Sequence, residues 1–305
     1  MKKIVRTLLL ASLCLLLPAT LCAQKKNTTK KAATTQTTYP QRDEAFKADY
    51  KLSAIGTFDP NNLESLQFTA MPAPDFTGHV LKLDKSRKQV KLKQLSCKQN
   101  GITDDDDWFF NNDLVRREER VELPMGQFAP RFRYRTGGYL ITTYGENWGN
   151  TLKVTITDEA QQTLYAAYDF ESYKFSPKTT LMGNTQSLDD FIIEGNILYF
   201  SFGTNSYSDG AGYQTGYIAA FDMEKQELIW VSQPLTCNSH FAVVDNSITC
   251  GYGFTSEPDN LFILDKYSGQ RIQKLTLKKM ALEVVPKNGY LYVRTYSYDY
   301  LFEIQ

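Results

Sequence analysis

The chain has 305 residues, with 34 Lys and Arg against 34 Asp and Glu, so its formal net charge at pH 7 is zero. This balance excludes the basic footprint of a nucleic-acid-binding protein. Of all residues 42% are hydrophobic, and 19 Tyr and 18 Phe are present; such residues favour strands because they pack well on a pleated surface. We therefore expect a globular all-β protein with no nucleic-acid partner.

Residues 1–23 have the pattern of an export signal, in which a basic start precedes an apolar run over residues 8–17 and a cleavage site at 21–23. The run is shorter than the ~20 residues of a spanning helix, so we do not expect an integral membrane protein. Lipid anchoring at Cys22 is disfavoured, because Leu21 stands where an anchor motif requires a small residue. The sequence predicts an exported protein, periplasmic or extracellular.

Residues 24–42 are mostly Lys, Thr, Ala, Gln and Asn and have almost nothing to bury, which predicts a disordered tether. Residues 43–305 are the predicted folded domain. Its first part is irregular: a short helix-compatible stretch at 43–50 is followed by turn-forming sequences at 59–62 and 71–74.

Two kinds of hairpin recur along the folded domain. The first kind has a turn just after an aspartate and is predicted over residues 79–95, 151–168, 216–232 and 260–277. The second kind precedes each later copy, with turns at Gly137-Gly138, Gly195-Asn196, Asp245-Asn246 and Asn288-Gly289. These turn residues accept the positive φ that two-residue hairpin loops require.

Together the two hairpins give four antiparallel strands in about 43 residues, the period and strand count of propeller blades and WD-like repeats. We predict a single β-propeller of about five four-stranded blades, with six as the alternative. The last copy ends after its third strand, and residues 63–71 are predicted to supply the fourth. Residues 96–130 are too long for a plain connection and are expected to contain a degenerate hairpin.

The sequences YIAAFDMEKQELIW (217–230) and FILDKYSGQRIQKL (262–275) resemble the PQQ-type repeat of the quinoprotein-like β-propeller superfamily. The resemblance covers residues 190–305 well and implies a propeller. Enzymes of that superfamily often carry an adjacent cysteine pair beside the quinone, which this chain lacks, so no cofactor is expected. Gln226 stands where the repeat has a turn glycine, whereas Gly269 conforms. Trp230, at a repeat position, is expected to pack between blades.

Three cysteines follow the predicted signal: Cys97, Cys237 and Cys250. If a tight hairpin forms at Asp245-Asn246, Cys250 lies opposite Phe241. Cys237 then lies four residues further along, roughly 13 Å away at about 3.3 Å per residue, whereas a disulfide requires Cα atoms within about 7 Å. We therefore expect unpaired and mostly buried thiols.

No catalytic motif is present, and the function is expected to be non-enzymatic. The two histidines, His79 and His240, each begin a predicted strand and are expected at blade edges. In the acidic run after residue 103, Asp104, Asp106 and Asp113 are candidate Ca²⁺ ligands. Their spacing matches no calcium loop, so a solvated acidic turn is favoured and no metal site is expected.

Aromatic residues near loops are the better candidates for a binding site. Trp148, Tyr207, Tyr213 and Tyr252, with Asp209 in the same long loop as two of them, would face one end of the ring, where they suit stacking on a sugar or a peptide. The alternative is that these rings fill space between blades.

The sequence favours a non-enzymatic, exported β-propeller that acts as a protein-binding or scaffold module in the cell envelope. The alternative is a carbohydrate-binding or carbohydrate-active propeller that uses the loop aromatics and carboxylates such as Asp209 and Glu146. The expected partner is accordingly another envelope protein or a glycan.

Overall fold

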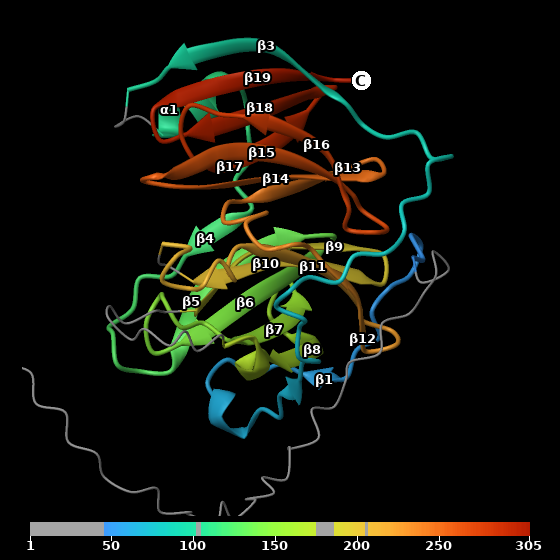
Figure 1. Ribbon diagram of the computed structural model, residues 1–305. Helices are drawn as coiled ribbons and strands as arrows, with labels where there is room; N and C mark the ends of the chain where they lie inside the picture. Colours follow the sequence, from blue (N-terminus) through green and yellow to red (C-terminus); the bar gives the residue numbers. More distant parts are fainter. Residues whose placement is uncertain (1–45, 102–104, 175–185, 205–206) are drawn as a thin grey trace, which may run out of the picture. The chain divides into compact units, whose positions relative to one another are not determined.

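The computed structural model describes residues 46–101, 105–174, 186–204 and 207–305 (Figure 1). All described residues belong to one compact unit. The predicted export signal and tether lie outside the described residues. Among the helices that are described, none is long and apolar enough to cross a membrane.

The strands form four sheets, which we call blades 1–4. Blade 1 contains β5 (Ala129–Thr136), β6 (Tyr139–Gly145), β7 (Lys153–Asp158) and β8 (Thr163–Asp169), with β4 (Glu118–Arg120) beside β5 and with β1 (Gly56–Thr57) and β2 (Thr69–Ala70) beside β8. Blade 2 contains β9 (Gln186–Glu194), β10 (Ile197–Thr204), β11 (Tyr217–Asp222) and β12 (Glu227–Val231). Blade 3 contains β13 (Phe241–Val244), β14 (Ser247–Phe254), β15 (Glu257–Asp265) and β16 (Arg271–Thr276).

Blade 4 contains β17 (Ala281–Lys287), β18 (Tyr290–Thr295), β19 (Tyr298–Ile304) and, from far earlier in the chain, β3 (Leu92–Gln99). The described helices are α1 (Asp105–Asn111) and two 3-10 turns, η2 (Leu63–Ser65) and η3 (Glu171–Tyr173). The all-β class and the four-stranded antiparallel blade are thus confirmed. Of the strand pairs, only β2 with β8 is parallel in the described residues.

The predicted turns are also confirmed. Each of the four two-residue loops joins the first two strands of a blade, and positive φ occurs at Gly137, Gly138, Gly195, Asp245, Asn288 and Gly289. The predicted register at Cys250, opposite Phe241, is also as the structure has it. These short-range features follow directly from local chemistry, because few residues adopt positive φ at low cost.

The number of blades differs from the prediction, since the described residues form four blades rather than five. The predicted hairpin at 79–95 is wrong: His79 makes one bridge to Val231 at the edge of blade 2, and β3 pairs with β19. An N-terminal strand completes the last blade as expected, but it is β3 and not residues 63–71, which form η2 and the short β2. An alternating run specifies a strand but not its partner.

The predicted degenerate hairpin within residues 96–130 is also wrong. The described part of this stretch contains the end of β3, the helix α1 and the three-residue strand β4, which extends blade 1 by pairing with β5. The acidic run was predicted to be a solvated turn, and its described residues instead begin α1.

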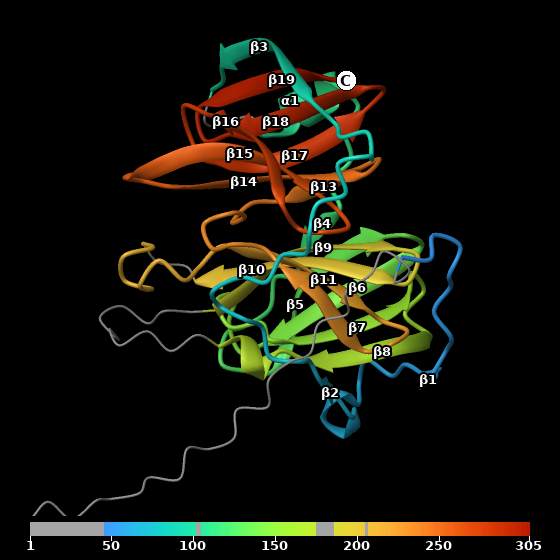
Figure 2. The same cartoon turned by 45° about the vertical axis from the view of Figure 1, so that its right-hand side comes forward.

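Consecutive blades pack against each other through their first strands: β9 contacts β5 and β6, β13 contacts β9, and β17 contacts β13, β14 and β15. Figures 1 and 2 both place blade 1 and blade 4 at opposite ends of this series, with blades 2 and 3 between them. The core therefore lies between neighbouring sheets, as expected for blades that cannot bury both faces alone.

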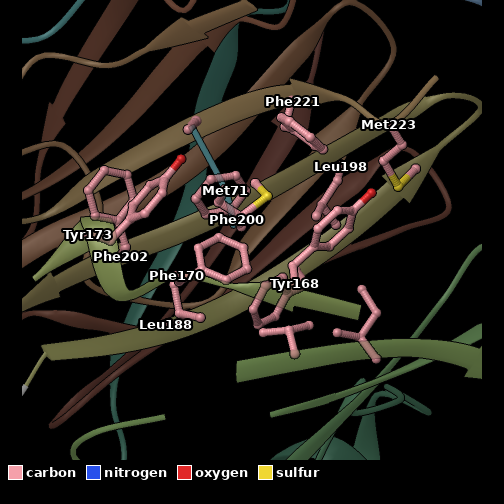
Figure 3. Close-up of a cluster of buried hydrophobic side chains, with 14 of the residues drawn as sticks. Met71, Tyr168, Phe170, Tyr173, Leu188, Leu198, Phe200, Phe202, Phe221 and Met223 are labelled. Atoms are coloured by element: carbon pink, nitrogen blue, oxygen red, sulfur yellow. The ribbon is translucent and has the colours of Figure 1, made fainter. Parts of the chain in front are cut away.

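The interface between blades 1 and 2 is largely aromatic (Figure 3). Tyr168 packs edge-to-face on Phe221 with ring centroids 5.5 Å apart, and Phe170 packs on Phe200 at 5.1 Å. Between blades 2 and 3, Trp230 is fully buried and its indole N–H donates to the carbonyl oxygen of Lys266 at 3.0 Å. The predicted packing of Trp230 between blades is confirmed.

Residues 71–91, which we call the strap, run from β2 to β3 past the blades (Figures 1 and 2). Backbone N–H groups along the strap donate to each blade in turn: Met71 to Asp169 of blade 1 (2.9 Å), His79 to Val231 of blade 2 (2.8 Å), Leu81 to Ser268 of blade 3 (2.8 Å) and Lys91 to Gln305 beside blade 4 (3.0 Å). The strap therefore ties all four blades together.

Candidate functional site: the inner-strand groove

A groove of about 480 Å³ lies along the first strands of blades 2, 3 and 4. We call it the inner-strand groove. Its described lining comes from Ile192 of β9, from residues 240–243 at β13, from residues 283–287 of β17, and from residues 113–117, which connect α1 to β4.

The connection at residues 113–117 is held in the groove by hydrogen bonds from side chains to backbone carbonyls. The Lys287 ammonium donates to the carbonyl oxygens of Asn112 (2.7 Å) and Asp113 (2.9 Å). The Arg117 guanidinium donates to the carbonyl oxygens of Phe191 (2.8 Å) and Phe241 (2.7 Å). These bonds join the connection to blades 2, 3 and 4 and fix the guanidinium between two inner strands.

Asp190 of β9 is the fully buried anion of the site. Its carboxylate accepts hydrogen bonds from the Arg117 guanidinium (2.5 Å) and from the backbone N–H groups of Phe241 (3.0 Å) and Phe191 (2.8 Å). Burial acts to raise the pKa of Asp190, but the charges of Arg117 and His240 outweigh burial, and the pKa lies below its ordinary value. Asp190 is therefore ionised and fully engaged at neutral pH.

His240 lies directly before β13, with its imidazole between two carboxylates. Its Nδ1 is 3.6 Å from Asp190 Oδ2, and its Nε2 is 3.2 Å from Glu118 Oε2. Burial acts to lower the pKa of His240, whereas the hydrogen bonds and charges of Asp190, and then Glu118, raise it well above the usual value. His240 is therefore an imidazolium at neutral pH and carries no free basic nitrogen.

Two further acids complete the charge network. Glu283 of β17 lies 3.5 Å from the Arg116 guanidinium, which also covers the Phe109 ring at 4.5 Å. Burial raises the pKa of Glu283 above its usual value, and His240 and Arg116 only partly oppose this. Burial likewise raises the pKa of Asp189 to about 6. The network thus contains four acids from three elements, together with two arginines and one imidazolium.

This arrangement suits binding better than catalysis. Arg116, Arg117 and His240 are each already paired with a carboxylate. The described lining contains no Ser, Thr, Cys or Tyr that would serve as a nucleophile beside His240. The remaining lining is mostly aliphatic, with Ile192, Val243 and Val285 on the inner strands and Val115, 76% exposed, on the connection. The groove therefore presents an apolar surface on a rigid charged base.

The aromatic residues predicted as binding candidates follow the second strand of their blades, or lie within it, and so gather at one end of the blades. Tyr207 and Tyr213 are exposed (45% and 61%) in the loop between β10 and β11, together with the exposed Asp209. Trp148, in the loop after β6, is half-buried beneath the Arg120 guanidinium, 3.4 Å from its ring.

Tyr252 is buried in β14, and its hydroxyl donates to the Glu257 carboxylate at 2.6 Å. The same carboxylate accepts the backbone N–H of Ser208 at 2.6 Å, and the Tyr207 ring packs on Phe254 at 4.7 Å. The structure therefore brings the long loop of blade 2 onto blade 3, next to Tyr252. Trp148 belongs to blade 1 and contacts Arg120 instead.

The candidate metal ligands do not assemble into a site within the described residues. Asp104 lies outside them, Asp106 is described only as part of α1, and the exposed Asp113 carboxylate lies 3.5 Å from the Lys287 ammonium. In the described part of the chain, no group of three His, Cys, Asp or Glu side chains is placed to hold a metal ion.

The charge network was not predicted from the sequence. Both histidines lie at blade edges as expected, His79 beside β12 and His240 before β13, but the partners of His240 come from distant elements. One signal was available: the acidic pair Asp189-Asp190 directly precedes the apolar residues Phe191, Ile192 and Ile193. A carboxylate in such a position requires a cationic or hydrogen-bonding partner when it is buried.

No known protein family matches the chain. No curated protein matches it either. Among solved structures, the chain resembles the crystal structure of BamB from Moraxella catarrhalis, with 12% sequence identity and a TM-score of 0.31 over 70% of this chain and the whole of that one. A likeness of this extent leaves the function of the chain to be argued from its own site.

Proposed function

We propose that the chain is an exported, non-enzymatic binding module that holds a segment of another envelope protein in the inner-strand groove. One observation carries the proposal: an apolar groove crosses three blades above a charge network whose members already pair with one another. Such a network holds its shape without a ligand, and pre-organised apolar grooves suit protein partners because little ordering is required on binding.

The placement in the envelope rests on the export pattern of residues 1–23. Val115, in the connection that lines the groove, also supports a protein partner. Its side chain is 76% exposed, although the next residue, Arg116, is paired with Glu283 of β17. An exposed aliphatic side chain at the mouth of a groove loses contact with water when a partner binds, which contributes roughly 25 cal/mol for each Å² of apolar surface removed.

Capture from envelope extracts with purified, immobilised protein tests this proposal. The wild type is expected to retain a discrete protein, and Val115→Glu is expected to lose it, because a charge enters the apolar groove. Phe110→Glu is the matched control: Phe110 is 82% exposed on α1 and does not line the groove. Equal capture by both variants and the wild type would overturn the proposal.

A second candidate function is glycan binding at the loop end of blades 3 and 4. A groove of about 450 Å³ there is lined by Phe254, Thr255, Asp259, Lys279, Met280 and Tyr296. Tyr296 is 57% exposed, and Tyr207 packs on Phe254 beside the groove. Exposed rings next to a carboxylate and an ammonium group suit a saccharide, whose C–H faces stack on aromatic rings and whose hydroxyls bond to charged groups.

Glycan-array binding distinguishes the two candidates. Binding that is lost in Tyr296→Ala and in Tyr207→Ala, but kept in Tyr290→Ala, favours the saccharide, since Tyr290 is 39% exposed and lies outside this groove. The carboxylates considered for a glycosidase, Asp209 and Glu146, lie in loops of blades 2 and 1. If the protein binds no glycan on the array, the glycan-binding candidate is excluded and the protein-binding proposal remains.

A further inference from the structure

Cys237 and Cys250 are both fully buried in the core between blades 2 and 3. All three cysteines of the described residues are free thiols in the structure, and Cys97, in β3, is only partly buried. The sequence predicts a separation of roughly 13 Å between Cys237 and Cys250, on the assumption that residues 237–240 continue β13 in an extended line. The structure shows a different path.

Residues 236–239 fold back beside β14. The Asn238 backbone N–H donates to the Gly251 carbonyl oxygen at 2.9 Å, and the Asn238 side chain bonds to both backbone groups of Gly253, at 2.7 and 3.1 Å. The Gly251 N–H in turn donates to the Ser239 hydroxyl at 2.9 Å. Residue 237 is therefore a near neighbour of residue 250 across this contact, and the predicted separation is wrong.

The two thiols meet in this contact. The Cys250 thiol lies 3.5 Å from the carbonyl oxygen of Thr236, the residue bonded to Cys237. The Cys237 thiol lies 3.4 Å from the carbonyl oxygen of Ser239. Burial raises the pKa of the Cys250 thiol well above its usual value, and a hydrogen bond with the Cys237 thiol adds to the effect. Each thiol is thus confined beside the other.

We propose that Cys237 and Cys250 form a disulfide when the chain folds in an oxidising compartment. Export of the chain is part of the proposed function, and the proposal rests on it for its setting in the cell. The geometry favours the bond, because the backbone hydrogen bond from Asn238 to Gly251 and the contact of the Cys250 thiol with the Thr236 carbonyl oxygen hold the two cysteines side by side, as a disulfide requires. The compartment favours it as well, because thiols there meet disulfide oxidants.

The oxidant is a disulfide, either of a protein or of glutathione. The thiolate of one cysteine attacks a sulfur of this disulfide, which forms a mixed disulfide and releases one thiolate. The second cysteine thiolate then attacks the chain's own sulfur in the mixed disulfide, which forms the Cys237–Cys250 bond and releases the second thiolate. Two electrons pass to the oxidant, and the two released thiolates take up the protons lost by the cysteines.

The bond would fix the connection between blades 2 and 3. It would join residues 232–240, which leave blade 2, to the second strand of blade 3, and His240 of the groove network lies three residues after Cys237. Because both cysteines are fully buried in the folded chain, an oxidant reaches them only before this connection packs over β14. Thiol–disulfide exchange therefore takes place during folding. A disulfide that closes a short loop stabilises chiefly by restricting the unfolded chain.

Refolding of the reduced, unfolded chain, residues 24–305, tests the proposal without reliance on export. Refolding proceeds in a glutathione redox buffer or in dithiothreitol, and iodoacetamide then labels the thiols in denaturant. Trypsin then releases the peptide 226–266, which contains both cysteines and no internal Lys or Arg. After refolding in the glutathione buffer, this peptide is expected to carry no label and to be lighter by two hydrogen atoms than the peptide with two free thiols. Cys97 is expected to be labelled. After dithiothreitol, all three cysteines are expected to be labelled.

Three labelled cysteines after the glutathione buffer, or Cys97 joined to either partner, would overturn the proposal. Two variants keep the result interpretable if folding is slow. Cys97→Ser is expected to keep the lighter peptide, whereas Cys250→Ser is expected to leave Cys237 labelled under both conditions. In Cys97→Ser, the thermal midpoint is expected to be higher after the glutathione buffer than after dithiothreitol by several degrees. These results do not depend on the capture of a partner protein, so the disulfide proposal and the proposed function can fail separately.

Discussion

At the scale of single residues, the molecule depends on a few buried polar groups that join blades. Asp190 receives hydrogen bonds from Arg117 and from the backbone of Phe241, so one carboxylate of blade 2 contacts both blade 3 and the connection 113–117. Breaking a buried ion pair by removing one partner is costly, because the remaining charge is left uncompensated.

Asp190→Asn is therefore expected to lower the free energy of unfolding by about 3–5 kcal/mol. The amide keeps the shape of the side chain but leaves the guanidinium of Arg117 without its carboxylate. Urea unfolding followed by tyrosine and tryptophan fluorescence measures the change. Asp209→Asn, at an exposed position, is the control and is expected to change stability by less than about 0.5 kcal/mol. Equal stability of the two variants would contradict the role of Asp190.

His240 predicts a dependence of stability on pH. The ordinary pKa of histidine is about 6.5, and the value in the folded protein lies well above it. Protonation therefore favours the folded state: the contribution of His240 is complete below about pH 6.5 and is lost as the pH rises through the folded value. Burial raises the pKa of Asp189 to about 6, so Asp189 destabilises the fold as the pH rises from about 4 to 6. That range lies below the range in which His240 acts.

Above about pH 6.5, the free energy of unfolding is thus expected to fall with rising pH more steeply in the wild type than in His240→Gln. Urea titrations at constant ionic strength across this range measure the two slopes. His79→Gln, at the β12 edge and outside the network, is expected to keep the slope of the wild type. Parallel slopes for the wild type and His240→Gln would show that the imidazolium does not stabilise the fold.

Glycines at two turns give a matched pair of substitutions. Gly269 and Gly138 both have positive φ, +72° and +81°. A Cβ on Gly269 would approach the Trp230 ring to 2.6 Å, whereas a Cβ on Gly138 would meet nothing within 4 Å. We expect Gly138→Ala to cost about 1–2 kcal/mol from the backbone alone, and Gly269→Ala to cost about 1–3 kcal/mol more from overpacking. Chemical denaturation measures both, and equal costs would contradict the close packing of Trp230.

At the scale of elements, the pairing of β3 is the feature that was hardest to predict from the sequence. Its alternating pattern predicts a strand, but the pattern does not identify the partner strand, and pairing with the nearest similar run, as in the predicted hairpin at 79–95, is wrong. The partner is β19, about 200 residues away, because β17, β18 and β19 supply only three strands of blade 4 and β3 pairs with the edge of β19. Turn residues, by contrast, were predicted correctly because their conformation depends on local chemistry.

Phe302→Ala tests whether β3 belongs to blade 4. Phe302 is 1% exposed and lies opposite Gln94 of β3. Its truncation is expected to cost about 3–5 kcal/mol and to speed amide hydrogen exchange in β3 together with β17–β19. Phe110→Ala, at an exposed position on α1, is the control. Unchanged exchange in residues 92–99 would show that β3 is not held by blade 4.

At the scale of the whole described unit, four blades pack in series and both end blades are covered. At blade 4, Trp108 of α1 packs on Tyr292 with ring centroids 6.2 Å apart. At blade 1, Phe58 packs with Tyr144 and Leu164. Repeat proteins need such covers, since a terminal repeat would otherwise expose the face that a neighbour buries. The class and the blade unit were predictable from periodicity, but the covers come from irregular segments without a repeat.

The groove could not be predicted for the same reason. It is formed where Arg117, His240 and Glu283 converge from three distant elements, and none of these residues belongs to a local motif. Sequence reasoning instead selected loop aromatics, because exposed rings are recognisable by composition. Two of these, Tyr207 and Tyr213, are exposed, and Tyr207 packs on Phe254 beside the groove of the second candidate function.

The central claim, that the inner-strand groove holds a partner protein, is tested most directly by crosslinking in intact cells. A photoreactive amino acid replaces Val115 at the groove or Lys225 in the exposed turn between β11 and β12. The account predicts one discrete crosslinked product from position 115 that is absent from position 225 and that Val285→Glu abolishes. The same products from both positions, or none from position 115, would contradict it.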